Sequence, residues 1–393
     1  MNRFLPAPRI ALFLCGCAAF LNLYATQGIL PVFAAQFALS PREASWSIGV
    51  TTLAVALMAP FVSRLTGVFE RRRVMVFCAL LLAEPALLIA QAQGFAELLL
   101  WRFAQGLLIP VLFATSVAYI GERWRGATVT EVTSLYVAGT VLGGFGGRFV
   151  TGLVTEWLGW REAFVVLAAL TLLIGLGIHL LLPAGPPGVA AAATGRGLAA
   201  RELRSRPLLA AYGVGFCVLF SQVAMFTYAG LHLGQAPYSL GPAALGTIYL
   251  VFLLALVVVP VAGRLGKSWP QVRLLGVACG LGVAGSLLTL LAPLPLMVAG
   301  LALSSTGVFL AQAAANAFTT ATARHNKAGA VGWYLSAYYL GGSLGAVLPA
   351  LLWQRWGWPG CVALIMAFQL GAWLLARWGW RPVNGSGGPP GSG

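Results

Sequence analysis

Two charged residues lie deep inside long apolar stretches of the sequence, where charge is rare. Glu84 lies about ten residues into the apolar run 73–92, and Arg102 lies about five residues into the run 97–119. A helix rises about 1.5 Å per residue, so Glu84 would lie about 15 Å deep in a membrane. An ionised group at that depth is costly, and it marks a functional site or an ion pair. Because the two runs are consecutive, we predict a helical hairpin in which Glu84 and Arg102 pair.

Further polar and aromatic residues lie in the middle of other apolar runs. At such a depth they either hydrogen-bond to neighbouring helices or contact a transported molecule, and both interpretations stay open. The candidates for substrate contact are Asn22, Tyr24, Gln27, Arg102, Gln105, Gln222, Phe226, Tyr228, Gln312, Asn316 and Tyr338. The candidates for proton coupling are Glu84, Arg102 and Glu131, and Arg148 is interpreted as a residue near the membrane surface.

The elements that position these residues are transmembrane helices. The chain has 393 residues, of which 59% are hydrophobic and 8% charged, and its mean hydropathy is +0.87, so its main solvent is lipid. Long continuous apolar runs favour helices over the alternating strands of a β-barrel. The sequence predicts an all-α membrane protein with twelve spans, at 10–36, 45–65, 73–92, 97–119, 129–154, 162–182, 208–231, 243–264, 272–291, 294–320, 330–352 and 359–378.

The distribution of basic residues predicts the orientation. A formal net charge of +15 would suggest a nucleic-acid partner in a soluble protein. Here most of the 24 Lys and Arg residues fall between the spans that face one side, which is the pattern of cytoplasmic loops. We therefore predict no nucleic-acid partner, cytoplasmic termini and a place in the cytoplasmic (inner) membrane.

An internal repeat predicts two similar halves. Tyr136, Gly143 and Gly147 are matched by Tyr334, Gly341 and Gly345, each 198 residues later, which equates the fifth span with the eleventh. The Pro-, Gly-, Ala- and Arg-rich segment 183–207 divides the halves and is typical of a linker. The predicted organisation is a six-helix bundle at 1–182, a cytoplasmic linker at 183–207, a second six-helix bundle at 208–380 and a disordered tail at 381–393.

These motifs together resemble the major facilitator superfamily, in particular its twelve-helix efflux-type branch of drug and sugar exporters. The first span carries NLYATQGILP (22–31), which is similar to a pattern of arabinose-efflux-like permeases. The fourth carries Arg102, Gln105 and Gly106, and the fifth carries a glycine series at 139–147 that ends before Arg148. The resemblance implies two pseudo-symmetric bundles and alternating access to a central site lined by spans 1, 4, 7 and 10.

Two departures from the family pattern concern conformational gating. The segment SRLTGVFERRR (63–73) keeps the basic cluster of the loop between the second and third spans but has Gly67 where the family has an aspartate. Gly144 stands where a proline is common in antiporters. The residues assigned to gating are Arg71, Arg72, Arg73, Gly139, Gly143, Gly147, Gly341, Gly342 and Gly345; the glycines also fit close helix packing.

The expected function is proton-coupled export of a small molecule by a monomer. Uptake symport and facilitated diffusion stay open, because a fold does not fix direction. A polytopic enzyme acting on a lipid-linked substrate is disfavoured, since the chain has no Asp and three widely separated His residues, and shows no phosphate-binding or metal-ligand motif. No cofactor and no metal are predicted.

Overall fold

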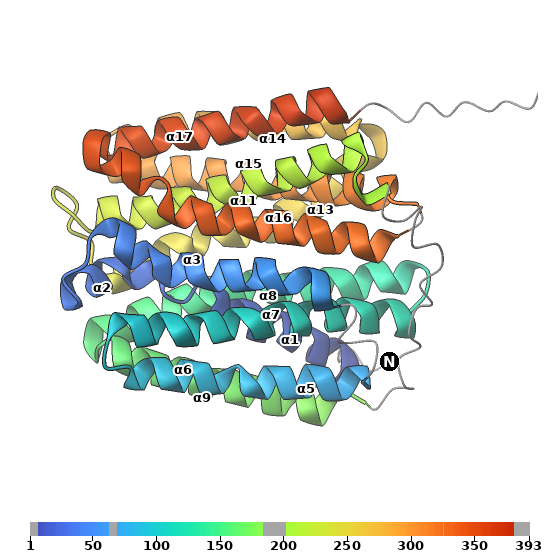
Figure 1. Cartoon of the computed structure of the whole chain (residues 1–393), viewed down its shortest axis with the longest axis horizontal. Helices are drawn as coiled ribbons and strands as arrows, with labels where there is room; N and C mark the ends of the chain where they lie inside the picture. The colour runs from blue at the N-terminus through green and yellow to red at the C-terminus, as the bar shows by residue number, and fades with distance from the viewer. Residues whose placement is uncertain (1–6, 63–68, 184–201, 325, 381–393) are drawn as a thin grey trace, which may run out of the picture.

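The computed structural model describes residues 7–62, 69–183, 202–324 and 326–380, which are almost entirely helical. Long helices run side by side along one common direction (Figure 1). The first half contains α1 (Ala7–Leu23), η1 (Gln27–Ile29), α2 (Leu30–Gln36), α3 (Pro41–Met58), η2 (Ala59–Phe61), α5 (Arg71–Leu81), α6 (Ala83–Gln91), α7 (Phe95–Arg123), α8 (Ala127–Trp157) and α9 (Trp160–Leu181).

The second half follows the same plan. It contains α11 (Arg206–Leu233), α12 (Pro242–Ile248), η3 (Tyr249–Leu254), α13 (Ala255–Ser268), α14 (Gln271–Leu288), α15 (Leu294–Thr322), α16 (Lys327–Val347) and α17 (Ala350–Gly379). Within α17 the backbone of Gly357 has φ 58° and ψ −145°, so two helices meet there. The residues before Gly357 therefore continue the direction of α16, and those after it form the last span.

The outer surface of the bundle is apolar, as lipid contact requires. Large hydrophobic side chains such as Phe77, Leu173 and Val257 are more than half exposed. In the described part of the chain, eleven helical segments are long and apolar enough to cross a membrane. Helix α16, of 21 residues, is not one of the eleven but lies packed beside them. Helix α16 packs between α11 and α3, and its serines donate hydrogen bonds to carbonyls of α3. The predicted all-α membrane fold is confirmed.

Glycine contacts show that the two halves repeat one another. A Cβ on Gly143 of α8 would collide with the Cys17 carbonyl of α1, and a Cβ on Gly341 of α16 would collide with the Phe216 carbonyl of α11. The glycines are 198 residues apart and their partners 199. The same close helix pair is therefore built twice, once in each bundle.

A local signal explains where α3 begins. The Ser40 side chain accepts a hydrogen bond from the Glu43 backbone N–H, and the Glu43 carboxylate accepts one from the Ser40 backbone N–H at 2.8 Å. This capping box, with Pro41 in the first turn, starts α3. The next span is thereby turned back into the membrane after the short helix α2.

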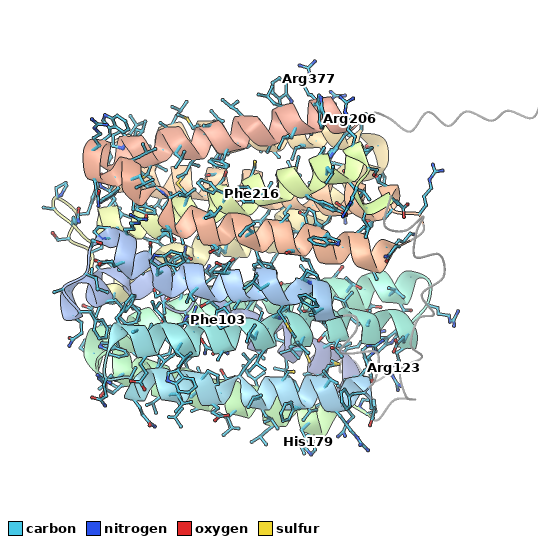
Figure 2. The ribbon with its side chains drawn as sticks, in the orientation of Figure 1. Phe103, Arg123, His179, Arg206, Phe216 and Arg377 are labelled. Atoms are coloured by element: carbon cyan, nitrogen blue, oxygen red, sulfur yellow. The ribbon has the colours of Figure 1, made fainter. Side chains whose placement is uncertain are left out.

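The two ends of the bundle differ in charge. Figure 2 shows Arg123, Arg206, Arg377 and His179 together at the end where α1 begins and α17 ends, which we call the basic end. The opposite end, called the far end, carries Glu43, Glu97, Glu156 and Glu162 close to the helix starts and ends. This asymmetry is the one that the positive-inside rule uses.

We expect the basic end to face the cytoplasm. A reporter that is active only in the periplasm should stay silent when fused after residue 195 or at residue 393, and should be active when fused after residue 240 at the far end. The opposite pattern would invert the orientation. Most of the predicted linker and all of the predicted tail lie outside the described residues, so these fusions also test the proposed division at 183–207.

Candidate functional site

A break in the first span is the centre of the buried polar structure. Helix α1 ends at Leu23 and the chain resumes as η1 at Gln27. Carbonyls released at such a break need new partners, because lipid supplies none. The Tyr24 carbonyl accepts from the Gln27 N–H at 3.0 Å, and the Ala25 carbonyl accepts from the Thr151 hydroxyl at 2.7 Å.

Arg102 of α7 satisfies the other carbonyls of the break. Its guanidinium is fully buried and donates to the carbonyls of Asn22 at 2.7 Å, Leu23 at 2.6 Å and Ser47 at 3.0 Å. It also donates to Gln105 Oε1 at 2.6 Å. A cation at the C-terminal end of α1 is favourably placed with respect to the helix dipole. Arg102 is therefore a clamp on the broken helix, with its donors directed at the protein.

The same network holds two more of the predicted substrate contacts. Gln105 Nε2 donates to Asn22 Oδ1 at 3.2 Å, and Asn22 Nδ2 donates to the Thr171 hydroxyl at 3.0 Å. Both amides are fully buried. Asn22, Gln105 and Arg102 thus bond to one another inside the first bundle in this structure.

The predicted pair between Glu84 and Arg102 is not formed. Glu84 is exposed on α6, where the buried positions are Pro85, Ala86, Ile89 and Ala90, so its side chain lies on the outer face of that helix. The carbonyls around Arg102 take the place of a carboxylate. Spacing along the hairpin placed the two residues at similar depth, but the helix faces that carry them point in different directions.

A second buried arginine, Arg148 of α8, lies where the two bundles meet. Its guanidinium carbon is 4.5 Å from the ring centre of Tyr24, 4.8 Å from that of Tyr249 and 4.9 Å from that of Phe252. Its Nε donates to Gln27 Oε1 at 2.8 Å, and an Nη donates to the Gly144 carbonyl. We call these five residues, Arg148, Tyr24, Gln27, Tyr249 and Phe252, the arginine cage.

Both bundles contribute to the arginine cage. Tyr24 and Gln27 come from the break in the first span, whereas Tyr249 and Phe252 come from η3 in the second half. Gln27 Nε2 also donates to the Thr227 hydroxyl of α11 at 3.0 Å. Phe226, the neighbour of Thr227, packs on the rings of Tyr249 and Phe252 at 5.5 and 4.5 Å between centres. The cage is therefore a polar contact between the halves inside the membrane.

The predicted position of Arg148 near the membrane surface is wrong. The fifth span was expected to end at 154, but α8 continues to Trp157. Arg148 is nine residues before that end, or about 14 Å at 1.5 Å per residue, and only 4% of it is exposed. The one sign of its burial in the sequence is its position directly after the glycine series that packs α8 against α1.

The electrostatics of the cage are those of a cation without a counter-charge. The chain has no aspartate, and its nine glutamates all lie in the described residues, where none is buried. The ion pairs of the described residues join Arg9 to Glu131, Arg71 to Glu122 and Arg73 to Glu70, and none involves Arg148. A single charge deep in a membrane costs about 2.5–3.5 kcal/mol on insertion scales. Rings and neutral acceptors offset that cost here.

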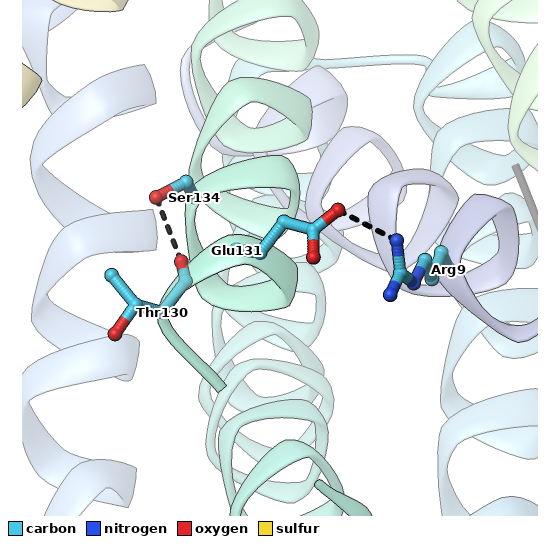
Figure 3. A network of polar contacts seen from close by, with 4 residues as sticks. All are labelled: Arg9, Thr130, Glu131 and Ser134. Carbon is cyan, nitrogen blue, oxygen red and sulfur yellow. Dashed lines mark hydrogen bonds and ion pairs between the residues drawn. The ribbon is translucent and has the colours of Figure 1, made fainter. Parts of the chain in front are cut away.

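Glu131 lies outside the cage. It is exposed near the start of α8 and pairs with Arg9 of α1 at 2.6 Å at the basic end (Figure 3). Figure 3 also shows Ser134 bonded to the Thr130 carbonyl on the same turn. This pair fastens α1 to α8 at the surface and is remote from the Arg148 side chain.

The other candidates fall into different environments. Tyr228 donates to the Ala346 carbonyl at 2.9 Å and so joins α11 to α16. Tyr338 is buried beside Tyr334 on α16. Gln222 is partly buried, and its Oε1 has no hydrogen-bond partner. Gln312 is partly buried and Asn316 exposed on α15, and the structure does not bring either into the cage.

The residues assigned to gating pack mainly inside the bundles. Added Cβ atoms on Gly139, Gly143 and Gly147 would strike α1, and those on Gly341, Gly342 and Gly345 would strike α11. At the basic end, Arg72 donates to the Leu182 carbonyl at 2.6 Å, while Arg71 and Arg73 form the ion pairs given above.

The close approach between the bundles depends on three other glycines. Added Cβ atoms on Gly28 and Gly246 would lie 3.3 and 2.9 Å from the Arg148 carbonyl, and one on Gly152 would strike the Pro242 carbonyl. Glu156 Oε2 also accepts from the Ala243 N–H at 3.2 Å at the start of α12. Helices α8 and α12 are thus in close contact at the far end, beside the cage.

Comparison with known proteins identifies the family. The model of the Major Facilitator Superfamily matches residues 12–346. An uncharacterized MFS-type transporter of Bacillus subtilis, YybF, is 30% identical over 372 residues, covering 94% of this chain and 91% of the relative. The inner membrane transport protein YnfM of Escherichia coli is 30% identical over 369 residues, covering 93% and 88%. A chloramphenicol efflux pump of Mycobacterium tuberculosis is 29% identical over 367 residues, covering 88% and 87%.

Solved structures agree on the fold. A bacterial homologue of the human lysosomal transporter Spinster superposes with a TM-score of 0.78 over 95% of this chain and 98% of that one, at 15% identity. The sequence-based expectation is confirmed by both kinds of comparison. The chain belongs to the major facilitator superfamily of membrane transporters.

Proposed function

We propose that this chain exports a small molecule from the cytoplasm by alternating access, powered by the proton-motive force. As a family member it is a membrane transporter and not an enzyme. The observation that carries the proposal is the arginine cage, because its residues come from both bundles and lie buried between them. A site shared in this way changes its exposure whenever the bundles rock against each other.

Export is the proposed direction, and one named relative supports it. One relative bears the name of an efflux pump, and the patterns in the first and fifth spans resemble those of exporters. In the proposed cycle the molecule enters from the basic end while α8 and α12 hold the far end closed. Separation of Gly152 from Pro242 then opens the far end, and closure of the basic end completes the exchange.

The placement of the glutamates bears on energy coupling. Glu84 lies on the outer face of α6 and Glu131 is in an ion pair at the basic end, so a proton on either would be remote from the cage. We propose that no buried carboxylate of the protein carries the coupling proton. The electrical and chemical parts of the proton-motive force then act on the transported molecule itself, in a monomer in the cytoplasmic membrane.

Metabolite comparison followed by reconstitution tests this function. Cells that express the chain should release a compound that cells without it retain, and proteoliposomes should move that compound against its concentration gradient under an imposed proton-motive force. A protonophore should abolish the accumulation. Accumulation in the opposite direction would make the chain an uptake symporter, and mere equilibration would make it a facilitator; either result refutes the proposal.

A further inference from the structure

Arg148 is a buried cation whose protein partners are all neutral. We propose that the arginine cage binds the anionic group of the transported molecule, a carboxylate attached to an apolar or aromatic body. This inference rests on the proposed transport function and adds the class of substrate. It excludes permanently cationic drugs, which the guanidinium would repel.

The two buried arginines of the first bundle differ in what they contact. Arg102 directs its donors at three carbonyls and an amide oxygen, which are the partners of a structural residue. Arg148 has three neutral acceptors, namely one amide oxygen, one carbonyl and the Tyr249 hydroxyl, and three aromatic rings surround its guanidinium. Rings contact the faces of a guanidinium, whereas its N–H donors lie in the plane. In the proposed complex a carboxylate binds at the edge of the guanidinium in place of one of these neutral acceptors, and the rings on its faces stay in position.

The surroundings of the cage suit an anion with an apolar body. A guanidinium matches the two oxygens of a carboxylate in a bidentate pair, which is its strongest form of recognition. The rings of Tyr24, Tyr249, Phe252 and Phe226 supply apolar and aromatic surface beside it. The amide of Gln27 and the hydroxyls of Thr227 and Tyr249 are the nearby neutral polar groups. No glutamate of the described chain competes for the guanidinium.

An anionic substrate also accounts for the absence of a buried acid. Export of an anion from a cell that is negative inside is favoured by the membrane potential. The protein then needs no carboxylate of its own to couple transport to the proton-motive force. A cage that served only as a latch between the bundles would bind no anion, and this difference can be measured.

Binding to the purified full-length chain in detergent tests the proposal without any gradient. The probes are benzoate, indole-3-acetate and octanoate, each compared with its neutral amide, and thermal unfolding is measured as a function of probe concentration. At least one carboxylate should raise the unfolding temperature with an apparent affinity at least tenfold better than its amide. If no carboxylate does better than its amide, the proposal is overturned.

Four variants locate the binding. Arg148→Gln should abolish the preference for carboxylate, and Arg148→Lys should weaken carboxylate binding at least tenfold, because an ammonium lacks the planar fork. Arg161→Gln is the matched control, since Arg161 also stacks on an aromatic ring, Trp160, at 4.5 Å but lies at the far end. Retained carboxylate preference in Arg148→Gln would overturn the proposal. If that variant does not fold, Phe252→Leu should still weaken carboxylate binding in a folded protein, and unchanged binding there counts against the cage.

The outcomes separate this inference from the proposed function. Carboxylate binding at Arg148 without gradient-driven transport would refute the export proposal and support the anion site. Gradient-driven export of a neutral or cationic compound that Arg148→Gln leaves unchanged would support the export proposal and refute the anion site.

Discussion

The Arg102→Met variant is expected to lose its folded form in the membrane. Methionine keeps much of the apolar volume of the arginine stem but has no donor, so the carbonyls of Asn22 and Leu23 lose the Arg102 donor. The Ser47 carbonyl of α3 loses it too but still accepts from the hydroxyls of Thr26 and Thr51, each at 3.4 Å. An unsatisfied buried polar group costs about 1–3 kcal/mol. The two carbonyls at the break, together with the donor lost by Ser47 of α3, therefore predict a destabilisation of about 3 kcal/mol or more. Thermal unfolding of the solubilised chain, followed by size-exclusion chromatography, measures it.

Matched substitutions separate this clamp from a general effect of removing a charge. Arg161→Met removes one hydrogen bond to the Ala90 carbonyl at the far end and should cost about 1 kcal/mol or less. Arg102→Lys should remain well below wild type, because one ammonium cannot span the three carbonyls. Normal stability of Arg102→Met would show that the break in α1 finds other donors, and the clamp would have to be abandoned.

Glu84→Gln is the third comparison in this series. The sequence suggested an ion pair, which would make the Glu84 and Arg102 substitutions non-additive. With Glu84 on the outer face of α6, we now expect Glu84→Gln to leave stability and transport nearly unchanged and the two effects to add. A rescue of Arg102→Met by Glu84→Gln would contradict the placement of Glu84.

The spans and the repeat could be predicted because they depend on local pattern. Apolar runs define membrane helices, and the repeated glycines mark helix pairs that the structure places alike in both halves. The positions of Tyr24 and Gln27 in the site could be proposed from the first span. That Arg148 is their partner could not be predicted, because the depth of Arg148 depends on how far α8 continues.

The arginine cage needed tertiary information that a single sequence does not carry. Tyr249 and Phe252 point at Arg148 because the chain forms a 3-10 segment at 249–254, and the apolar run 243–264 gives no sign of this. The direction of a side chain also decides the fate of Glu84. Glu84 is exposed together with Leu87 and Gln91 on the outer face of α6. The number of residues from the end of a span predicts how deep a residue lies, but it does not say which face of the helix carries the side chain.

The Gly246→Leu variant is expected to fold but to lose most of its transport. Gly246 of α12 lies against the Arg148 carbonyl and the Gly152 backbone of α8, so a leucine side chain would push the two helices apart at the far end. Overpacking costs about 1–3 kcal/mol, and this cost falls only on the state in which the bundles touch there. The balance between the two states should then shift about 5- to 150-fold toward the open far end.

Spin labels at Glu162 and Gln235, exposed positions at the far end on the two bundles, can measure this shift. Their mean distance should increase in Gly246→Leu. Gly263→Leu is the matched control, because Gly263 lies in the same span with nothing within 4 Å of an added Cβ, and it should transport like wild type. Gly345→Leu, which fills a contact within the second bundle, should instead impair folding. If Gly246→Leu transports normally with unchanged label distances, contact between α8 and α12 is not the closure of the far end, and the exit route proposed here is wrong.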